Sequence, residues 1–354
     1  MLGFERPVAA NLMGVLGPQL EVVHSFRLMP VMAVRPPRGW TASAALAMPG
    51  LSFVEQNGQV LALETVPWGV ERVGAPAAQR QFTGAGINVA ILDTGIDSQH
   101  EDLRVLGGAS FVGGDHEDRN GHGTHVAGTI AGLGTRRGVV GVAPGVRLYA
   151  VKVLDDDGVG TWLSVARGIE WAVRNNMRVV NLSLGSPQAS RTLELACREA
   201  EEAGSLLVGA AGNSGGPTGA ESSVNYPAAF GQVIAVAASD QRNHRAPWSS
   251  TGPEVELIAP GAAILSTAPG NRYTELSGTS MACPHVSGAA ALAWSATPGL
   301  SALQVRCLLA DTAEDLGMNH GLQGRGLVRA DRAVEEAGKQ SPNRRPQVSG
   351  LHPV

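Results

Sequence analysis

Five nearly uninterrupted apolar runs, separated by helical patterns, limit what this chain can fold into more than any other feature. The runs cover residues 87–93, 147–154, 178–185, 204–212 and 232–238. Strands that are apolar on both sides suit a parallel sheet with both faces covered. Helical patterns lie between the first four runs, at 124–133, 161–176 and 190–204. The β-α-β-α order predicts an α/β domain with a doubly wound, mostly parallel sheet and helices on both faces.

The first 62 residues follow a different pattern and predict a separate, small α+β unit. VMAVRP and LSFVEQNGQVLAL are expected strands, and VAANLMGVLGPQL and TASAALAM are expected short helices. The main domain is then expected over residues 63–338. Residues 339–354 are polar and proline-rich, which favours a flexible C-terminal tail.

The composition excludes several classes of partner. A net charge of -4 over 354 residues provides no basic surface for nucleic acid or an anionic membrane. No apolar run reaches the ~20 residues that span a bilayer. The cysteines Cys197, Cys283 and Cys307 form neither a complete disulfide set nor a zinc-site spacing, so we expect them to be small buried hydrophobes.

Three polar residues stand where the predicted sheet should have its crevice. Asp93 ends an apolar strand, His122 opens a small-residue helix, and Ser280 opens an apolar helix. Strand ends and helix starts of this kind face one crevice in a doubly wound sheet. A serine hydroxyl needs an adjacent base such as neutral imidazole, and a buried carboxylate orients that imidazole. His125, three residues after His122, is expected to be structural.

A second serine complicates this interpretation. Gly212-Asn213-Ser214-Gly215-Gly216 fits the G-x-S-x-G pattern of hydrolase nucleophiles. An α/β-hydrolase, however, carries its histidine downstream of the serine, whereas His122 lies far upstream. A metallopeptidase would need H-E-x-x-H, which the chain lacks. The residues alone leave Ser214 and Ser280 as two candidates.

The segments ILDTGID, GHGTHVAGTIAG and GTSMACPHVSGAAAL resemble the three catalytic motifs of the subtilisin-like serine proteases, and the order Asp, His, Ser is theirs. The resemblance runs from about Glu64 to Val334. It implies a serine endopeptidase that hydrolyses peptide bonds through an acyl-enzyme, with Asp93, His122 and Ser280 as the triad. It also implies that Asn213 is an oxyanion-hole donor and Ser214 a bystander. A catalytically silent relative would lack one of these groups, and all four are present.

The same resemblance implies where a protein or peptide substrate binds. The family holds its substrate as an extended strand between two backbone edges, which match Gly158-Val159-Gly160 and Ser183-Leu184-Gly185. The primary pocket is expected between Leu184, Gly185, Ala210, Ala211 and Gly212. Asn225 stands where relatives often carry glycine, and Trp162 is expected in a second apolar subsite. The run Asp155-Asp156-Asp157 is either a selector for a basic substrate residue or a solvated turn.

The family commonly holds a structural calcium ion, although the chemistry needs no cofactor. The matching positions are Glu64, Asp102, Leu133, Thr135, Arg137 and Val139. Oxygen ligands suit this ion. The chain departs from the family at Glu64 and Thr135, where Gln and Asn are usual, and Arg136 and Arg137 bring positive charge to the loop.

Residues 1–62 resemble the family's inhibitory propeptide, which has a ferredoxin-like fold, and imply a zymogen that cleaves itself between about Ala62 and Thr65. The propeptide would then be an intramolecular inhibitor of its own enzyme. The alternative is an extension without a regulatory role. The family favours an extracellular location, but the first residues do not form a secretion signal, which leaves a cytoplasmic location open.

Overall fold

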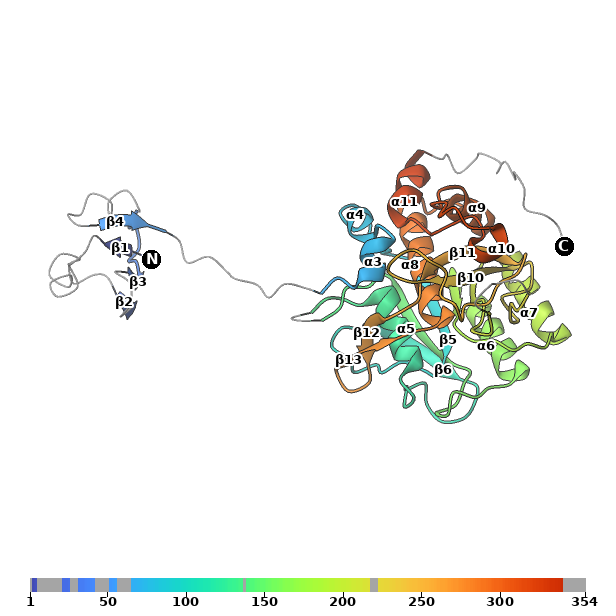
Figure 1. Ribbon diagram of the computed structural model, residues 1–354. Coiled ribbons are helices and arrows are strands. Elements are labelled where there is room, and N and C mark those ends of the chain that lie inside the picture. Colours follow the sequence, from blue (N-terminus) through green and yellow to red (C-terminus); the bar gives the residue numbers. More distant parts are fainter. Residues whose placement is uncertain are drawn as a thin grey trace. The chain divides into compact units, whose positions relative to one another are not determined.

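The computed structural model describes residues 2–4, 21–25, 31–41, 51–55, 65–135, 138–216 and 222–339. The chain divides into two compact units, one within residues 1–62 and one within residues 63–354 (Figure 1). Among the described helices, none combines the length and the apolar character needed to cross a membrane.

The first unit contains an antiparallel sheet with the strand order β2-β3-β1-β4. Its strands are β1 (Leu2–Phe4), β2 (Glu21–Ser25), β3 (Val31–Arg35) and β4 (Leu51–Val54). Strands β3 and β4 lie in the two segments that were expected to be strands. The two expected helices lie outside the described residues, apart from Thr41. The ferredoxin-like fold of this unit therefore stays a prediction.

The second unit is built on a seven-stranded sheet with the order β11-β10-β9-β8-β5-β7-β6. Every neighbouring pair in it is parallel. The five apolar runs became strands, which confirms the predicted parallel sheet. The strands are β5 (Asn88–Asp93), β6 (Val105–Ser110), β7 (Arg147–Lys152), β8 (Val179–Leu182), β9 (Leu206–Ala210), β10 (Val233–Ser239) and β11 (Val255–Pro260).

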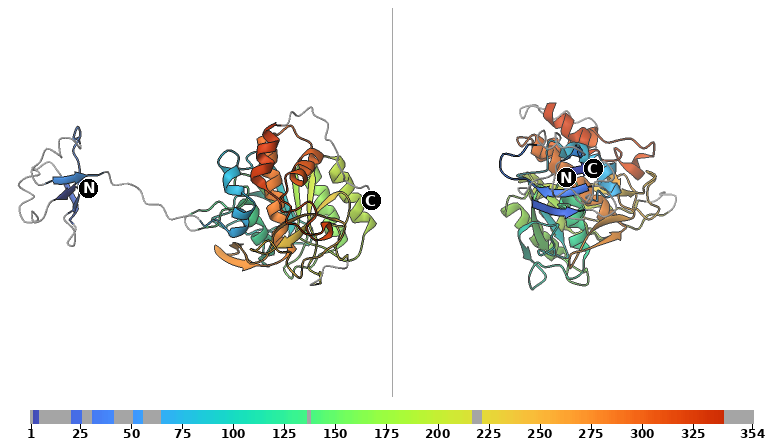
Figure 2. Two further views of the ribbon diagram at one scale, coloured as in Figure 1. Left: turned by 45° about the horizontal axis from the view of Figure 1, so that its top comes forward. Right: turned by 90° about the vertical axis from the view of Figure 1, so that its left-hand side faces the viewer.

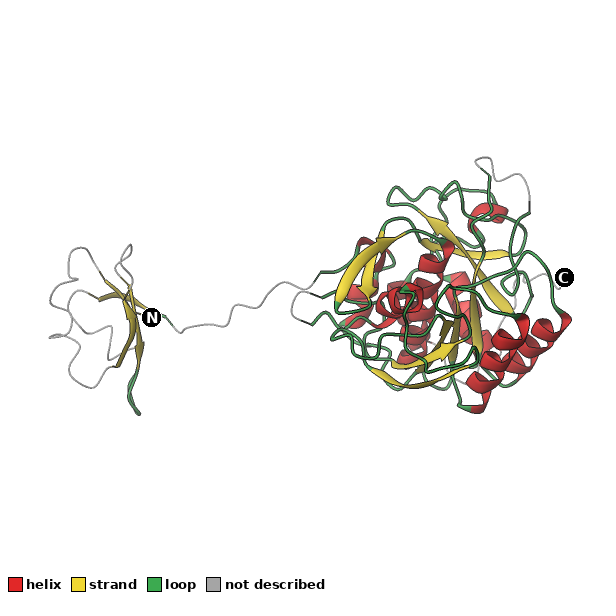
Figure 3. Ribbon diagram, turned by 90° about the horizontal axis from the view of Figure 1, so that it is seen from below, coloured by secondary structure: helices red, strands yellow, loops and turns green. Residues whose placement is uncertain are grey.

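Helices cover both faces of this sheet (Figures 1 and 3). On one face, α6 (Trp162–Arg174) and α7 (Arg191–Glu202) bury an apolar layer against β5, β7, β8 and β9. The other face carries α5 (His122–Ala131), α8 (Thr279–Ala296), α9 (Ala302–Asp311) and α11 (Ala330–Lys339), with α3 (Trp68–Arg72) and α4 (Ala75–Gln79) at its edge. Figure 2 shows α8 packed beside α11.

Two smaller elements complete the unit. The antiparallel ribbon of β12 (Ile264–Ala268) and β13 (Arg272–Leu276) packs on α5, and α10 (His320–Gln323) lies near β11. The small residues of α5 allow the ribbon to approach closely, because a Cβ added to Gly128 would collide with Oγ1 of Thr267 in β12. Helix α8 also depends on a small residue. A Cβ added to Gly288 of α8 would lie 2.5 Å from Cβ of Val142, so no larger residue fits there without a shift.

Strand β5 marks the point at which the winding of the sheet changes direction. After β5 the chain passes through β6 and α5 to β7 on one side, and then through α6 to β8 on the other side. Connections that leave a strand pair in opposite directions open a crevice beyond the carboxyl ends of the strands. Asp93 is the last residue of β5 and therefore stands at this crevice.

Candidate active site

The Asp93 carboxylate is fully buried at the end of β5. Its Oδ1 accepts hydrogen bonds from the backbone N–H of Thr94 and from Nδ1 of His122, both at 2.7 Å. Its Oδ2 has no hydrogen-bond partner among the described residues. A buried carboxylate oxygen without a partner costs free energy.

The His122 ring joins this carboxylate to a pocket. His122 is the first residue of α5, its side chain is 28% exposed, and it lines the pocket. A carboxylate only accepts hydrogen bonds, so Nδ1 carries the proton and Nε2 is left as the basic nitrogen. Burial lowers the pKa of His122, but the charge and hydrogen bond of Asp93 and the charge of Asp118 outweigh it and raise the pKa above 6.5.

Ser280 reaches the same crevice from the start of α8. Its hydroxyl donates a hydrogen bond to the carbonyl of Ser183 at 3.2 Å, and Ser183 lines the pocket together with His122. Within the described ranges, no hydrogen bond joins the Ser280 hydroxyl to the His122 ring. Such bonds are often long before substrate binds.

A proline explains how the start of α8 is tied to β8. Pro284 has no N–H and cannot donate to the carbonyl of Ser280, four residues earlier. The hydroxyl of Ser183 replaces the missing donor at 2.9 Å. Asn181 supports Ser183 with a hydrogen bond from Nδ2 to Oγ, also at 2.9 Å. The two serines are thus held together from both sides.

Cys283 lies beneath this contact and is buried, as expected. Its sulfur lies 3.2 Å from Oδ1 of Asn181 and 3.3 Å from the carbonyl oxygen of Val208, and these two acceptors share the single thiol proton. Burial raises the pKa of Cys283 to about 12, so the thiol stays protonated at neutral pH. Cys197 is also buried, whereas Cys307 is partly exposed, contrary to the expectation that all three cysteines are buried.

Asn213 presents a free amide beside Ser280. Its Oδ1 accepts from the N–H and the hydroxyl of Thr279, at 2.9 and 3.1 Å, so its Nδ2 points away from Thr279. A Cβ built on Gly278 would lie 3.5 Å from that Nδ2 and 3.7 Å from the Ser280 backbone nitrogen. The Ser280 N–H has no partner within its helix because it belongs to the first turn. Two N–H donors therefore border one small space.

The pocket has a volume of about 700 Å³ and runs along the predicted substrate edges. Of the predicted substrate-binding residues, Gly158, Val159, Gly160, Trp162, Ser183, Leu184 and Gly185 line it. Ala210 and Gly212 do not line this pocket, and neither do Ala211 and Asn225. The pocket is also lined by residues that the sequence analysis did not single out: Thr94, Asn120, Leu154, Thr161, Val165, Ser186, Leu193 and Tyr226. Their proximity in the chain to the predicted segments was the available signal.

The side chain of Asn225 lies between the backbones expected to wall the primary pocket. A Cβ on Gly185 would come within 2.9 Å of Cβ of Asn225. A Cβ on Gly212 would come within 2.8 Å of its Nδ2. The amide therefore occupies space that a glycine at position 225 would leave open.

Ser214 stands apart from the acid and the base. It is exposed, and its backbone N–H donates to the hydroxyl of Ser250 at 3.2 Å. In the described part of the chain, no histidine or acidic side chain is hydrogen-bonded to it. This contrasts with the surroundings of Ser280.

The predicted calcium ligands do not form an open ring of oxygens. Both oxygens of buried Asp102 are saturated: Oδ1 accepts from N and Oγ1 of Thr135, and Oδ2 accepts from N of Val139 and Oη of Tyr273, at 2.5–3.0 Å. The carbonyl of Val139 accepts from Gly134.

Calcium takes 6–8 oxygen ligands. The described residues contain no cluster of three or more acidic, histidine or cysteine side chains. The described members of the set, Asp102, Leu133, Thr135 and Val139, therefore do not fit the ion, and Glu64 and Arg137 lie outside the described residues.

A doubly wound parallel sheet with a carboxylate, an imidazole and a helix-start serine at its crevice is the arrangement of a serine hydrolase. The profile of the Subtilase family matches residues 84–327, and the chain belongs to this family. It is a subtilisin-like serine endopeptidase, which acts on protein or peptide substrates.

The relatives carry names of the same kind. The thermostable alkaline protease of Halalkalibacterium halodurans is 49% identical over 319 residues, which cover 89% of this chain and 86% of that protein. Subtilisin BL of Lederbergia lenta is 53% identical over 77% of this chain and 99% of its own length. Subtilisin DY of Bacillus licheniformis is 50% identical over 77% of this chain and its own full length.

Proposed function

We propose that the protein cleaves peptide bonds through a triad of Asp93, His122 and Ser280, with Asn213 as a donor to the oxyanion. The observation that carries this proposal is the 2.7 Å bond between Asp93 Oδ1 and His122 Nδ1, which leaves Nε2 as the basic nitrogen of a pocket-lining ring. The tie between Ser280 and the pocket-lining Ser183 supports the choice of nucleophile.

The reaction follows from these groups. In the reacting enzyme, Oγ of Ser280 gives its proton to Nε2 of His122 as Oγ attacks the carbonyl carbon of the substrate. Asp93 stabilises the imidazolium, and the new oxyanion accepts from Nδ2 of Asn213 and the N–H of Ser280. His122 then gives the proton to the leaving amine. Water, deprotonated by the same ring, hydrolyses the acyl ester and releases the Ser280 hydroxyl.

The test compares the two candidate serines. Ser280→Ala is expected to abolish peptidase activity and labelling by a sulfonyl fluoride. Ser214→Ala is the matched control and should keep most of both. A million-fold loss is the value known for the subtilisin nucleophile, and it is taken over from the family. Equal losses in the two variants, or a label found by mass spectrometry on Ser214, would reject the assignment.

We propose that substrate binds as an extended strand between residues 158–160 and 183–185, both of which line the pocket. Pairing of main chains reads few side chains, so specificity is broad. Asn225 limits the depth of the primary pocket, and Trp162, whose residue is 43% exposed at the pocket, provides an apolar surface for a second substrate residue. The acidic run at 155–157 is a solvated turn, because Oδ1 of Asp155 accepts from the N–H groups of Asp157 and Val159.

We further propose a zymogen, with an inhibitory propeptide in residues 1–62, the peptidase in 63–338 and a tail in 339–354. The compact unit within residues 1–62 supports the first boundary. Purified wild-type protein should lack about the first 62 residues, whereas Ser280→Ala made in a protease-free host should keep them. Loss of the segment from that variant would exclude self-cleavage. The extracellular location that the family favours stays a prediction.

A further inference from the structure

Asp118 accepts five hydrogen bonds at the start of the helix that carries His122, although it is not one of the triad residues. Its Oδ1 accepts from the hydroxyl of Thr94 at 2.9 Å and from the N–H groups of Asn120 and Gly121 at 3.0 and 2.8 Å. Its Oδ2 accepts from N and Oγ1 of Thr124, at 2.9 and 2.6 Å. Only 6% of the residue is exposed. A buried carboxylate with five hydrogen bonds holds the donating groups in defined positions.

These bonds replace the cap that α5 lacks. The N-cap position is Gly121, at φ 107°, which has no side chain to satisfy the free N–H groups of the first turn. Asp118 accepts from two of the N–H groups at this end, and its negative charge faces the positive end of the helix dipole. His122 is the first residue of this helix. Asp118 therefore holds the end of α5 from which the His122 side chain projects.

Thr94 extends the same network to the acid of the triad. Its N–H donates to Oδ1 of Asp93, and its hydroxyl donates to Asp118 while accepting from the N–H of Gly123 at 3.0 Å. One chain of hydrogen bonds thus runs from Asp93 through Thr94 to Asp118 and on to α5. The acid and the base are set relative to each other by a group that touches neither ring nor substrate.

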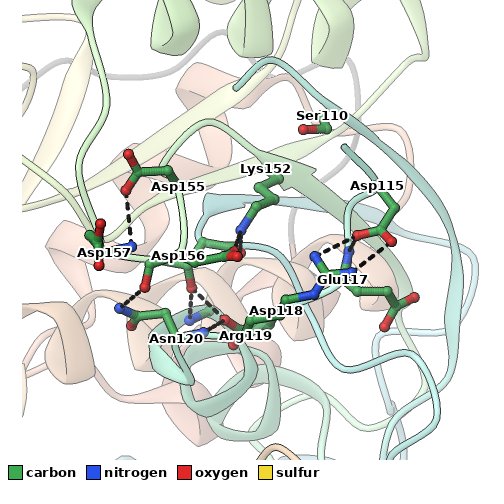
Figure 4. Close-up of polar contacts among 12 residues, drawn as sticks. Ser110, Asp115, Glu117, Asp118, Arg119, Asn120, Lys152, Asp155, Asp156 and Asp157 are labelled. Atoms are coloured by element: carbon green, nitrogen blue, oxygen red, sulfur yellow. Dashed lines mark hydrogen bonds and ion pairs between the residues drawn. The ribbon is translucent and has the colours of Figure 1, made fainter. Parts of the chain in front are cut away.

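The neighbouring acidic residues do not share this role. Figure 4 shows Asp115 paired with Arg119, and both side chains are more than half exposed. It also shows Asp156 paired with Lys152, whose ammonium donates to the carbonyl of Thr94 at 2.5 Å. Asp155 is used in its own turn. Of these acidic residues, Asp118 alone accepts hydrogen bonds both from the start of α5 and from Thr94, which follows β5.

We propose that Asp118 is a positioning residue for catalysis, which holds the His122 ring against Asp93 through the start of α5 and through Thr94. This inference rests on the proposed triad. The charged and titratable groups that act on His122 are Asp93 on β5 and Asp118, and His125 lies on the same helix. Lys152, which pairs with Asp156, contacts the carbonyl of Thr94. Of these, Asp93 and Asp118 raise the pKa of His122.

The experiment measures kcat/KM for a peptide substrate against pH, together with Tm, for three single variants. Asp118→Asn is expected to lower kcat/KM about 10- to 100-fold, because misplacing a catalytic group by about 1 Å costs up to 100-fold. Its acidic limb, which reports the base of the free enzyme, should move to lower pH. Thr94→Val should also lower kcat/KM and move the acidic limb to lower pH, but by less. Glu314→Gln weakens an ion network with Arg72 and Arg329 away from the pocket, so it should lower Tm and leave both kcat/KM and the acidic limb unchanged.

Two results would overturn the proposal. The first is an Asp118→Asn enzyme whose kcat/KM stays within about threefold of wild type with an unmoved acidic limb. The second is a loss of activity that only follows the fraction unfolded, as in Glu314→Gln. If Asp118→Asn does not fold, Thr94→Val decides, and an unmoved limb there counts against the proposal. Ser280→Ala is assayed alongside: retained activity in that variant would refute the triad itself, whereas its inactivity leaves the role of Asp118 to the other variants.

Discussion

Two buried histidines predict that the protein loses stability in mild acid. His125 donates from Nε2 to the carbonyl of Ile264, and His285 donates from Nδ1 to the carbonyl of Met281. The remaining ring nitrogen of each has no partner among the described residues, and both residues are fully buried. Protonating either ring would place an unpaired charge in the core. Burial lowers the pKa of both histidines to about 4, from 6.5.

The size and sign of the effect follow from these values. In the unfolded chain both rings take up a proton near pH 6.5, whereas in the folded protein they do so only near pH 4. The unfolded state therefore binds more protons in this window, and stability falls as the pH falls from 6.5 to 4. At about 1.4 kcal/mol per pKa unit, each histidine contributes about 3 kcal/mol to the free energy of unfolding at neutral pH, and this contribution is lost as the pH falls to 4. The free energy of unfolding of a typical protein is only about 5–15 kcal/mol. His122 acts in the opposite direction, because its pKa is raised.

The assay is guanidinium unfolding of Ser280→Ala protein, which should not digest itself, at several pH values between 4.5 and 7. His285→Asn keeps a donor for Met281 and should reduce the fall in the free energy of unfolding by about half, and His125→Asn should do likewise. His244→Asn is the matched control, because the His244 side chain is 74% exposed, and should leave the slope unchanged. A free energy of unfolding that is independent of pH in this window, or that falls equally in all variants, would refute the reasoning.

Two further predictions concern specificity and metal. Asn225→Gly removes the amide beside Gly185 and Gly212. For substrates with a large aromatic residue before the cleaved bond, kcat/KM should therefore rise about tenfold relative to substrates with a small residue there. An unchanged ratio of the two kcat/KM values in a peptide panel would contradict this. Chelation should leave Tm within a few degrees, because the lone pairs of Asp102 already accept from Thr135, Val139 and Tyr273. Asp102→Asn should lower Tm by about 4–8 °C. A large fall of Tm on chelation that calcium reverses, and that Asp102→Asn abolishes, would show a bound ion.

Much of the sheet could be predicted because its central strands are buried on both faces. Apolar runs such as 87–93 and 232–238 carry that signal alone. Strand β6 was missed because it is a glycine-containing, half-exposed edge strand. Strand β11 was missed because it carries Glu256, which is buried only through its ion pair with Arg306 at 2.5 Å. A partner 50 residues away cannot be seen in a local pattern.

The candidate site divides in the same way. Asp93, His122 and Ser280 could be found because each sits in a distinctive short motif. Asp118 could not, because its importance comes from donors on two separate elements. Nor could the sequence tell that the Asn225 side chain is directed between two glycine backbones, since this depends on how β9 and the segment after β8 meet.

The proline in α8 has a consequence for engineering the enzyme. Because the hydroxyl of Ser183 donates to the Ser280 carbonyl that Pro284 leaves without a helical donor, and the Ser280 hydroxyl donates back to Ser183, the proposed nucleophile is hydrogen-bonded directly to one of the proposed substrate-binding edges. Substitutions at residues 183–185 that are meant to change substrate affinity are therefore expected to change kcat as well. Variants of this segment should be screened for kcat and KM together.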